Sequence, residues 1–295
     1  MIIQGNCLDE LKNIPDCSID CVVTSPPYWA LRDYGVDGQI GLEPTFQEYI
    51  NNLCNIFDEV KRVLKKEGTC WVNMGDTYFG SGSGKEFEGY KYQQFCGAAC
   101  SGADNTPRTV KGKMSDKCLC QIPSRFAIEM TNRGWILRNE IIWHKPNCMP
   151  SSVKDRFTVD FEKVFFFVKN KKYWFETQYE SATYTDSRKD KGNIKYNNRN
   201  TNCGVTVSDK RNKRAVWRVT TKPFKEAHFA TYPEDLIETP IKAGCPEGGV
   251  VLDPFFGAGT TGVVAKKQNK DYIGIELNPE YIDIANKRLQ QEILL

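Results

Sequence analysis

The segment Thr24–Tyr28 reads Thr-Ser-Pro-Pro-Tyr and follows the apolar run Ile19–Val23. Two consecutive prolines cannot continue a central strand, because each lacks a backbone N–H and has a fixed φ. We therefore expect a buried strand that ends in a stiff loop, at the edge of a sheet where ligands bind. This loop should present the hydroxyl of Ser25, two uncommitted backbone carbonyls and the ring of Tyr28. Such acceptors beside an aromatic ring suit the binding of a flat ring that carries an amino group.

A second segment suited to ligand binding lies near the C-terminus, where the apolar run Val250–Leu252 leads into Asp253 and a glycine-rich turn. We expect a helix over Thr260–Gln268 and then a buried strand over Tyr272–Glu276. This is the βαβ layout of a nucleotide-binding crevice, in which the carboxylate that ends the second strand holds ribose hydroxyls. The turn, Gly257-Ala-Gly-Thr-Thr-Gly, also fits the pattern G-x-G-x-x-G, so an NAD or flavin oxidoreductase is an alternative.

The two segments together resemble the motifs of one enzyme family. Phe255-x-Gly257-x-Gly259 after Asp253 is similar to the cofactor motif of the amino-group DNA methyltransferases. Thr24–Tyr28 resembles the catalytic motif of the same family, in the form most often associated with N4-cytosine methylation. The catalytic motif precedes the cofactor motif here, and that order resembles the β group of the family. The resemblance covers residues 1–76, 117–176 and 226–295, and includes His228–Pro233 and Gly134–Lys145.

The resemblance implies an α/β fold, a doubly wound Rossmann-like methyltransferase sheet with an inserted basic target-recognition region. It implies transfer of a methyl group from S-adenosyl-L-methionine to the exocyclic amine of a flipped base in double-stranded DNA. Ser25 favours cytosine N4, because the adenine enzymes of the family more often have Asp or Asn at this position. Adenine N6 is the alternative. The catalytic residues implied are Ser25, Pro26, Pro27 and Tyr28. The cofactor residues implied are Asn6, Asp9, Thr231, Asp253, Phe255, Gly257, Gly259, Thr260, Glu276 and Asn278.

One interval of the chain is strongly basic. Thr185–Lys225 holds twelve Lys or Arg and three acids, a local net charge of +9 in a chain whose net charge is +3. Charge this concentrated indicates a polyanionic partner, although a solvated surface loop has the same composition. In the family that the chain resembles, this interval holds the target-recognition region. The residues expected to bind DNA are Lys195, Arg199, Arg211, Arg214, Trp217 and Arg218.

The spacing of apolar residues predicts the elements that position these segments. Thr45-Phe-Gln-Glu48 is a capping box that opens a helix to about Lys66, and Gly68 should end it. The other expected helices are Leu8–Asn13, Pro123–Arg133 and one from Pro279 to near Leu294. The other expected strands are Ile2–Gln4, Thr69–Asn73, Ile136–Trp143 and Val164–Lys169. Strands that alternate with helices predict a doubly wound sheet.

The chain has 295 residues, of which 40% are hydrophobic, enough for one large domain with a smaller attached one. We expect a catalytic half in residues 1–76 and 117–176, a flexible insertion in 77–116, a target-recognition region in 177–227 and a cofactor half in 228–295. No membrane-length apolar stretch and no signal peptide are found, so a cytoplasmic protein is expected. A cognate restriction endonuclease is a possible partner, and either a monomer or a homodimer fits.

Twelve cysteines are many for a chain in a reducing compartment, where a disulfide framework is not expected. Cys96, Cys100, Cys118 and Cys120 offer four thiols for a tetrahedral zinc site. The second pair has only one intervening residue, which departs from the usual zinc spacing, so unliganded cysteines are the default and no metal is expected. Carbon-5 methylation needs a cysteine nucleophile, but amino methylation does not. A non-catalytic DNA-binding module with the same fold is the remaining alternative.

Overall fold

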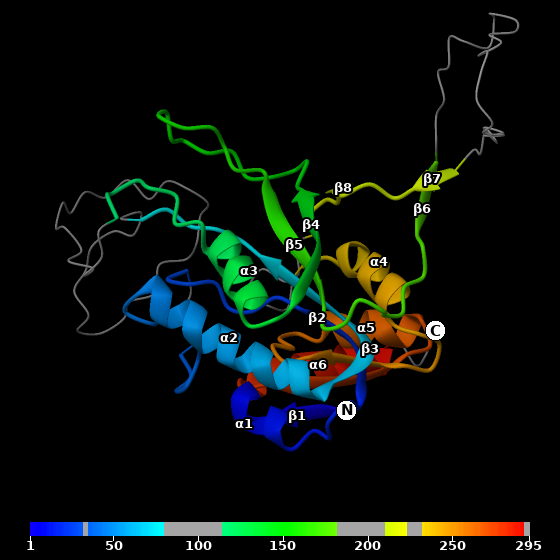
Figure 1. Ribbon diagram of the computed structural model, residues 1–295. Coiled ribbons are helices and arrows are strands. Elements are labelled where there is room, and N and C mark those ends of the chain that lie inside the picture. The colour runs from blue at the N-terminus through cyan, green and yellow to red at the C-terminus, as the bar shows by residue number, and fades with distance from the viewer. Residues whose placement is uncertain (32–34, 80–113, 182–209, 223–231, 292–295) are drawn as a thin grey trace, which may run out of the picture. The chain divides into compact units, whose positions relative to one another are not determined.

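The computed structural model describes residues 1–31, 35–79, 114–181, 210–222 and 232–291 (Figure 1). Its helices are α1 Cys7–Lys12, α2 Phe46–Val63, α3 Ile122–Asn132, α4 Glu234–Gly244, α5 Thr260–Lys267 and α6 Pro279–Gln291. Its strands are β1 Ile2–Gln4, β2 Ile19–Thr24, β3 Leu64–Met74, β4 Ile136–His144, β5 Phe161–Val168, β6 Tyr179–Ser181, β7 Lys210–Asn212, β8 Val216–Arg218, β9 Val250–Asp253 and β10 Asp271–Glu276. The chain divides into a large unit, residues 1–176 and 215–295, and a small unit, residues 177–214.

The large unit is built on a mixed sheet with the strand order β1-β10-β9-β2-β3-β5-β4-β8. The strands from β1 to β3 in this order run parallel, and β5 is antiparallel to both of its neighbours. The chain leaves β9 through α5 toward one edge of the sheet, and leaves β2 through α2 toward the other. The two directions part between β9 and β2, which is the switch point where α/β sheets bind ligands. This doubly wound, Rossmann-like sheet confirms the expected fold class.

Helices cover both faces of this sheet (Figure 1). Successive strand side chains point to opposite faces. Val22 therefore packs in a core that contains α2 and α3, whereas its neighbours Cys21 and Val23 pack in a core that contains α4 and part of α5. A third small cluster joins α5 to α6 through Phe256, Val263, Ala285 and Leu289. A sheet buried on both sides accounts for the uniformly buried pattern of β2.

The predicted helix after Thr45 forms, but it ends earlier than expected. The Thr45 hydroxyl accepts a hydrogen bond from the Glu48 N–H at 3.2 Å, as a capping box requires. The helix ends at Val63, and Leu64 already belongs to β3, paired with Ile19 of β2. Gly68 lies inside that strand, so the prediction that it ends the helix is wrong. Its absent side chain has a packing reason, because a Cβ there would lie 2.6 Å from the Leu64 Cδ1 atom.

Helix α4 has no counterpart among the predicted elements. Pro240 lies inside it, and an internal proline normally argues against a helix. The helix is held by tertiary burial, since Leu236, Ile237 and Ile241 pack in the core against β2 and β3. Strand β8 was also not predicted; three residues, of which only Trp217 is buried, are too few to show a pattern.

The small unit contains the two-stranded ribbon β6–β7. The strands are antiparallel, with Glu180 opposite Arg211. The Glu180 carboxylate accepts hydrogen bonds from the Nε atoms of Arg211 at 2.7 Å and Arg214 at 2.6 Å. These arginines lower the pKa of Glu180, with Arg211 as the larger cause. Much of the basic interval and of the expected insertion, residues 182–209 and 80–113, lies outside the described residues.

Among the described residues, no helix is long and apolar enough to cross a membrane. Nor does the described part of the chain hold a group of His, Cys, Asp or Glu side chains that could bind a metal ion. Of the four cysteines considered for zinc, Cys118 is exposed and Cys120 is buried, with its thiol pKa raised to about 11 by burial. Cys96 and Cys100 lie outside the described residues.

Candidate active site

The two motif segments meet at the switch point of the sheet. Thr24 is the last residue of β2, and Asp253 is the last residue of the adjacent strand β9. The Thr24 hydroxyl donates a hydrogen bond to the Asp253 Oδ1 atom at 2.6 Å, and both residues are only 1% exposed. Residues 229 positions apart are thereby joined at the point where the catalytic loop and the glycine turn begin.

The Asp253 carboxylate is held by protein groups on both oxygens. Oδ1 accepts from Thr24 and from the Phe255 N–H at 3.0 Å; Oδ2 accepts from the Tyr232 hydroxyl at 3.0 Å and from the Thr261 hydroxyl at 2.5 Å. Burial raises the pKa of Asp253, and these four donors oppose that shift. The carboxylate therefore shapes the start of the glycine turn and links it to β2.

The glycine turn leads into α5 with two residues in the left-handed region. Gly259 has φ +81°, and a Cβ there would lie 2.8 Å from that of Ala285, so both its conformation and its packing require glycine. Gly257 has φ +52°, but a Cβ there would meet no described atom within 4 Å. The backbone at Gly257 therefore borders open space, which a ligand can approach.

Glu276, at the end of β10, lies beside this turn. Its carboxylate accepts hydrogen bonds from the Gly257 N–H at 2.7 Å and from the Asn278 N–H at 2.8 Å. Burial raises the pKa of Glu276, and the bond from Asn278 is the largest opposing effect. A carboxylate has about four acceptor positions, so the bonds from Gly257 and Asn278 do not use its full capacity, and a ligand's hydroxyl group can still donate to it.

Next to β10, Asn6 follows strand β1 and caps α1. Its amide oxygen accepts from the Leu8 N–H at 3.0 Å, and its amide nitrogen donates to the Gly38 carbonyl at 3.2 Å. It lines a cavity of about 180 Å³ with the apolar side chains of Leu8, Ile40 and Ile56, several amides and the carboxylate of Glu43.

The remaining predicted cofactor residues have different surroundings. Asp9 is exposed on α1 and pairs with Lys12 at 3.0 Å, and it does not line the cavity. Phe255 is partly buried against the core on the α2 side of the sheet. The Thr260 hydroxyl accepts from Arg288 at 3.0 Å. Thr231 lies outside the described residues.

The catalytic loop is rigid for more reasons than its prolines. The Tyr49 hydroxyl donates to the Pro27 carbonyl at 2.8 Å, so this carbonyl is not one of the uncommitted carbonyls expected in the loop. No group in the described parts of the chain donates to the Pro26 carbonyl, and it remains an acceptor. The ring of Tyr28 packs against Gly75, where a Cβ would lie 2.7 Å from the Tyr28 Cε2 atom.

The Tyr28 hydroxyl points into a polar cluster that sequence reasoning did not assemble. It donates to the Glu162 Oε2 atom at 2.7 Å, and the Asn73 Oδ1 atom lies 3.2 Å away. Lys145 forms an ion pair with the other oxygen of Glu162. Burial, and then the charge of Glu162, raise the pKa of Tyr28 well above its ordinary value, so the phenol stays protonated. A polar residue at the end of β3, the neighbour of β2, was a usable signal for Asn73.

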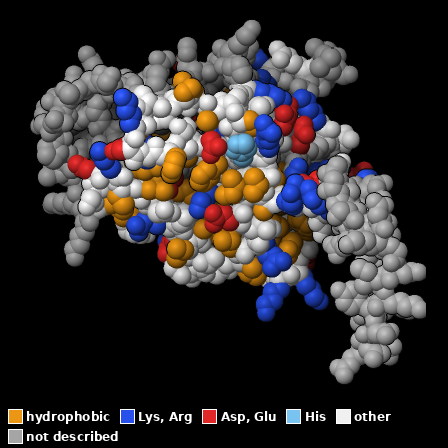
Figure 2. Space-filling view, turned by 90° about the horizontal axis from the view of Figure 1, so that it is seen from above, with side chains coloured by type: hydrophobic (Ala, Val, Ile, Leu, Met, Phe, Trp, Pro, Cys, Tyr) orange, Lys and Arg blue, Asp and Glu red, His pale blue; other side chains and the backbone are white. Residues whose placement is uncertain are grey.

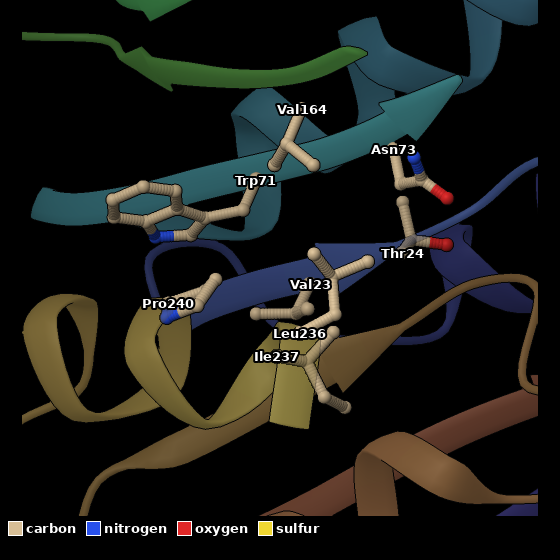
Figure 3. Close-up of a pocket in the computed structure, with 8 residues that line it drawn as sticks. All are labelled: Val23, Thr24, Trp71, Asn73, Val164, Leu236, Ile237 and Pro240. Carbon is tan, nitrogen blue, oxygen red and sulfur yellow. The ribbon is translucent and has the colours of Figure 1, made fainter. Parts of the chain in front are cut away.

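Figure 3 shows the gap between the sheet and α4 behind this loop. Thr24 and Asn73 lie side by side at one end of it, and Leu236 and Ile237 of α4 face Val23. The enclosed volume is about 10 Å³, no more than a single water molecule requires. This gap is therefore not the substrate site.

The residues predicted to bind DNA differ in their surroundings. Arg211 and Arg214 lie in the small unit and bond Glu180, while Arg218 is exposed on β8. Trp217 is 8% exposed in the core of the large unit, so the structure does not support the prediction that it stacks on bases. Strand alternation accounts for this, because Trp217 points inward between two exposed neighbours. Lys195 and Arg199 lie outside the described residues.

Comparison with known proteins identifies the family. A family model described as DNA methylase, of the N6/N4 class, matches residues 19–287. The chain is 44% identical over 291 residues to the type II methyltransferase M.Cfr9I of Citrobacter freundii, covering 99% of this chain and 88% of the relative. It is 40% identical over 288 residues to the type II methyltransferase M.SmaI of Serratia marcescens, covering 98% and 90%.

Solved structures share the fold. The cytosine-N4-specific PvuII DNA methyltransferase aligns over 97% of this chain and 85% of its own, with a TM-score of 0.66 and 20% identity. TTHA0409 from Thermus thermophilus, complexed with S-adenosyl-L-methionine, aligns over 99% and 95%, with a TM-score of 0.60 and 23% identity. The chain belongs to the N6/N4 family of DNA methyltransferases, enzymes that transfer a methyl group from S-adenosylmethionine to an amino group of DNA.

Proposed function

We propose that this enzyme methylates the N4 amino group of a cytosine that is flipped out of double-stranded DNA. The observation that carries the proposal is the bond between Thr24 and Asp253, which brings the Ser-Pro-Pro-Tyr loop beside the glycine turn. A serine in that loop favours cytosine, and the PvuII enzyme that shares the fold is described as cytosine-N4-specific. The exocyclic amine of a stacked base pair is out of reach of such a loop, so the base must leave the stack.

The loop activates the amine by accepting hydrogen bonds from its N–H groups. The lone pair of an exocyclic amine is delocalised into the ring, which makes the nitrogen a poor nucleophile. Hydrogen bonds from the amine to the Ser25 hydroxyl oxygen and the Pro26 carbonyl favour a tetrahedral nitrogen with a localised lone pair. The bond from Tyr49 to the Pro27 carbonyl holds the loop, so the Pro26 carbonyl does not have to be positioned at the moment of reaction.

S-adenosylmethionine supplies an electrophilic methyl group, and this chain's residues fit its parts. The cavity beside Asn6 suits the adenine ring, and Glu276 has acceptor positions left for the ribose hydroxyls. The open space at Gly257 suits the methionine end. Asp253, Phe255, Gly259, Thr260 and Asn278 act by shaping this turn, because their polar groups bond other protein groups.

The connection between β4 and β5, residues 145–160, is a surface that suits the DNA around the flipped base. It starts at Lys145, which pairs with Glu162 near the start of β5, and Glu162 in turn accepts a hydrogen bond from Tyr28. Phe157 on this connection is 97% exposed, and Met149 and Val159 are also exposed. Figure 2 shows the molecule from above, where apolar side chains gather at the centre of the face and both basic and acidic side chains lie among and around them. Exposed apolar side chains are the wedges that some DNA-binding proteins insert between unstacked bases.

The type II names of the relatives support a partnership with a restriction endonuclease that cuts the same DNA site. Within such a pair, methylation by this enzyme would protect the host's DNA from cleavage. Co-expression with that nuclease, followed by measurement of cell survival, tests the pairing.

The catalytic assignment is tested by transfer of a radiolabelled methyl group to DNA. Ser25→Ala and Tyr28→Ala should lose transfer while they retain binding of S-adenosylmethionine, measured by calorimetry. Val216→Ala, which removes an exposed side chain of β8, is the matched control and should keep full activity. Full transfer by Ser25→Ala would refute the assignment.

A further inference from the structure

Each hydroxyl group of the catalytic loop can either donate or accept a hydrogen bond. For Ser25 to accept a hydrogen bond from the target amine, its own proton must point elsewhere. A serine hydroxyl that instead donates toward the base would oppose the amine's protons and leave its lone pair delocalised. The neighbours of Ser25 determine which of the two arrangements forms.

Two acceptors, the Glu162 carboxylate and the Asn73 amide oxygen, lie near the hydroxyl groups of Ser25 and Tyr28. The Tyr28 hydroxyl lies 2.7 Å from the Glu162 Oε2 atom, closer than the 3.2 Å to the Asn73 Oδ1 atom. A hydrogen bond to a carboxylate is shorter and stronger than one to an amide, so the Tyr28 proton points to Glu162. The Tyr28 oxygen then turns its lone pairs toward the loop.

Ser25 is left with acceptors on its inner side. Its hydroxyl oxygen lies 3.4 Å from the Tyr28 hydroxyl oxygen and 3.5 Å from the Asn73 Oδ1 atom. The amide nitrogen of Asn73 donates to the Lys163 carbonyl at 3.3 Å, which turns Oδ1 toward the two hydroxyls. Whichever acceptor it uses, the Ser25 proton points into the protein, and the lone pairs of Ser25 face outward.

We propose that Glu162 is a positioning residue that sets the direction of this hydrogen-bond chain, so that Ser25 meets the target amine as an acceptor. Lys145 pairs with the second oxygen of Glu162, and its own ammonium group lies 4.3 Å from the centre of the Trp143 ring. These two contacts hold the carboxylate in place on the side away from Tyr28. Glu162 never touches the base; it acts through Tyr28. The inference rests on the proposed function, because it assumes that Ser25 contacts the amine, and it applies to cytosine and adenine alike.

Glu162→Gln tests the direction of the chain with almost no change of shape. Lys145 attracts the amide oxygen of the glutamine, which leaves the amide N–H₂ group facing Tyr28 and makes it a donor where the carboxylate accepted. We expect kcat to fall by about 10- to 100-fold, the loss typical of a charge-assisted bond, with the KM for S-adenosylmethionine and the affinity for DNA unchanged. Glu140→Gln is the matched control, because it removes another carboxylate–lysine pair nearby, the pair that Glu140 of β4 forms with Lys163 of β5, and it should leave kcat unchanged.

A double-mutant cycle with Tyr28→Phe separates positioning from general structural support. The phenylalanine variant has no hydroxyl to orient, so Glu162→Gln should cost no further activity in that background. An equal loss of kcat in both backgrounds, or a kcat of Glu162→Gln within about twofold of the wild type, would overturn the proposal. Should the glutamine variant melt early, Glu162→Asp keeps the charge but withdraws it from Tyr28, and should lose kcat in the same way.

Failure of the proposed function is distinguishable in the same experiment. If the wild type transfers no methyl group to DNA, the proposed function fails before any variant is compared. If it forms a methylated base and Glu162→Gln performs equally well, only the positioning role fails.

Discussion

Replacement of Thr24 by valine tests whether Asp253 ties the catalytic loop to the glycine turn. Valine keeps the shape of threonine but removes the 2.6 Å bond to a carboxylate that is 1% exposed. Hydrogen bonds to charged groups contribute roughly 1.5–3 kcal/mol. Three other donors remain on Asp253, so we expect the free energy of unfolding to fall by about 2 kcal/mol, roughly a 30-fold change in the folding equilibrium.

The assay is urea unfolding followed by circular dichroism, together with kcat for methyl transfer. Tyr232→Phe is the matched variant, because it removes a different donor from the same carboxylate. Both variants should lose similar stability, but only Thr24→Val should also lower kcat, since Thr24 directly precedes Ser25. If Thr24→Val changes the free energy of unfolding by less than about 0.5 kcal/mol and keeps full kcat, the link between the two segments is not what positions the site.

Three further predictions concern the cofactor and the DNA. Gly257→Ala and Gly248→Ala both force alanine into a left-handed conformation with open space around it, so each should cost about 1 kcal/mol of stability. Only Gly257→Ala should weaken S-adenosylmethionine binding, measured by calorimetry. Equal affinities of the two variants would contradict the assignment of Gly257 to the cofactor site. Burial raises the pKa of Glu276, and ribose hydroxyls donate best to its ionised form, so affinity for the cofactor should fall as the pH drops through that raised pKa. Glu276→Gln has no titrating group there and should not show this fall. Parallel pH profiles of the wild type and the variant would contradict the role of Glu276 in binding the ribose. Phe157→Ala should reduce DNA affinity about tenfold in gel-shift titrations without lowering the melting temperature of the protein. Unchanged affinity would contradict the proposal that Phe157 inserts between bases.

Much of the fold followed from local patterns in the sequence. Apolar runs that end in a proline pair or a glycine turn located β2 and β9, and the capping box located the start of α2. Each motif was expected where a strand ends at the ligand-binding edge of the sheet, and the bond between Thr24 and Asp253 agrees with that expectation. These features are local or depend on chain order, so a single sequence contains them.

What the sequence did not predict depends on contacts between distant segments. The end of α2 is decided by the pairing of Leu64 with Ile19, and α4 persists around Pro240 because the core covers it. Trp217 looked like a stacking residue because its neighbours are basic, but strand alternation turns it inward. The cluster of Tyr28, Asn73 and Glu162 brings together β5 and the ends of β2 and β3, and no spacing in the chain indicates it.

The identity of the methylated base tests the central claim most directly. Plasmid DNA is incubated with the purified enzyme and S-adenosylmethionine, digested to nucleosides and analysed by mass spectrometry, with the Ser25→Ala variant as control. A loop that presents the Ser25 oxygen and the Pro26 carbonyl to a flipped cytosine predicts N4-methyldeoxycytidine with the wild type and none with the variant. N6-methyldeoxyadenosine as the product, or equal product from Ser25→Ala, would contradict it.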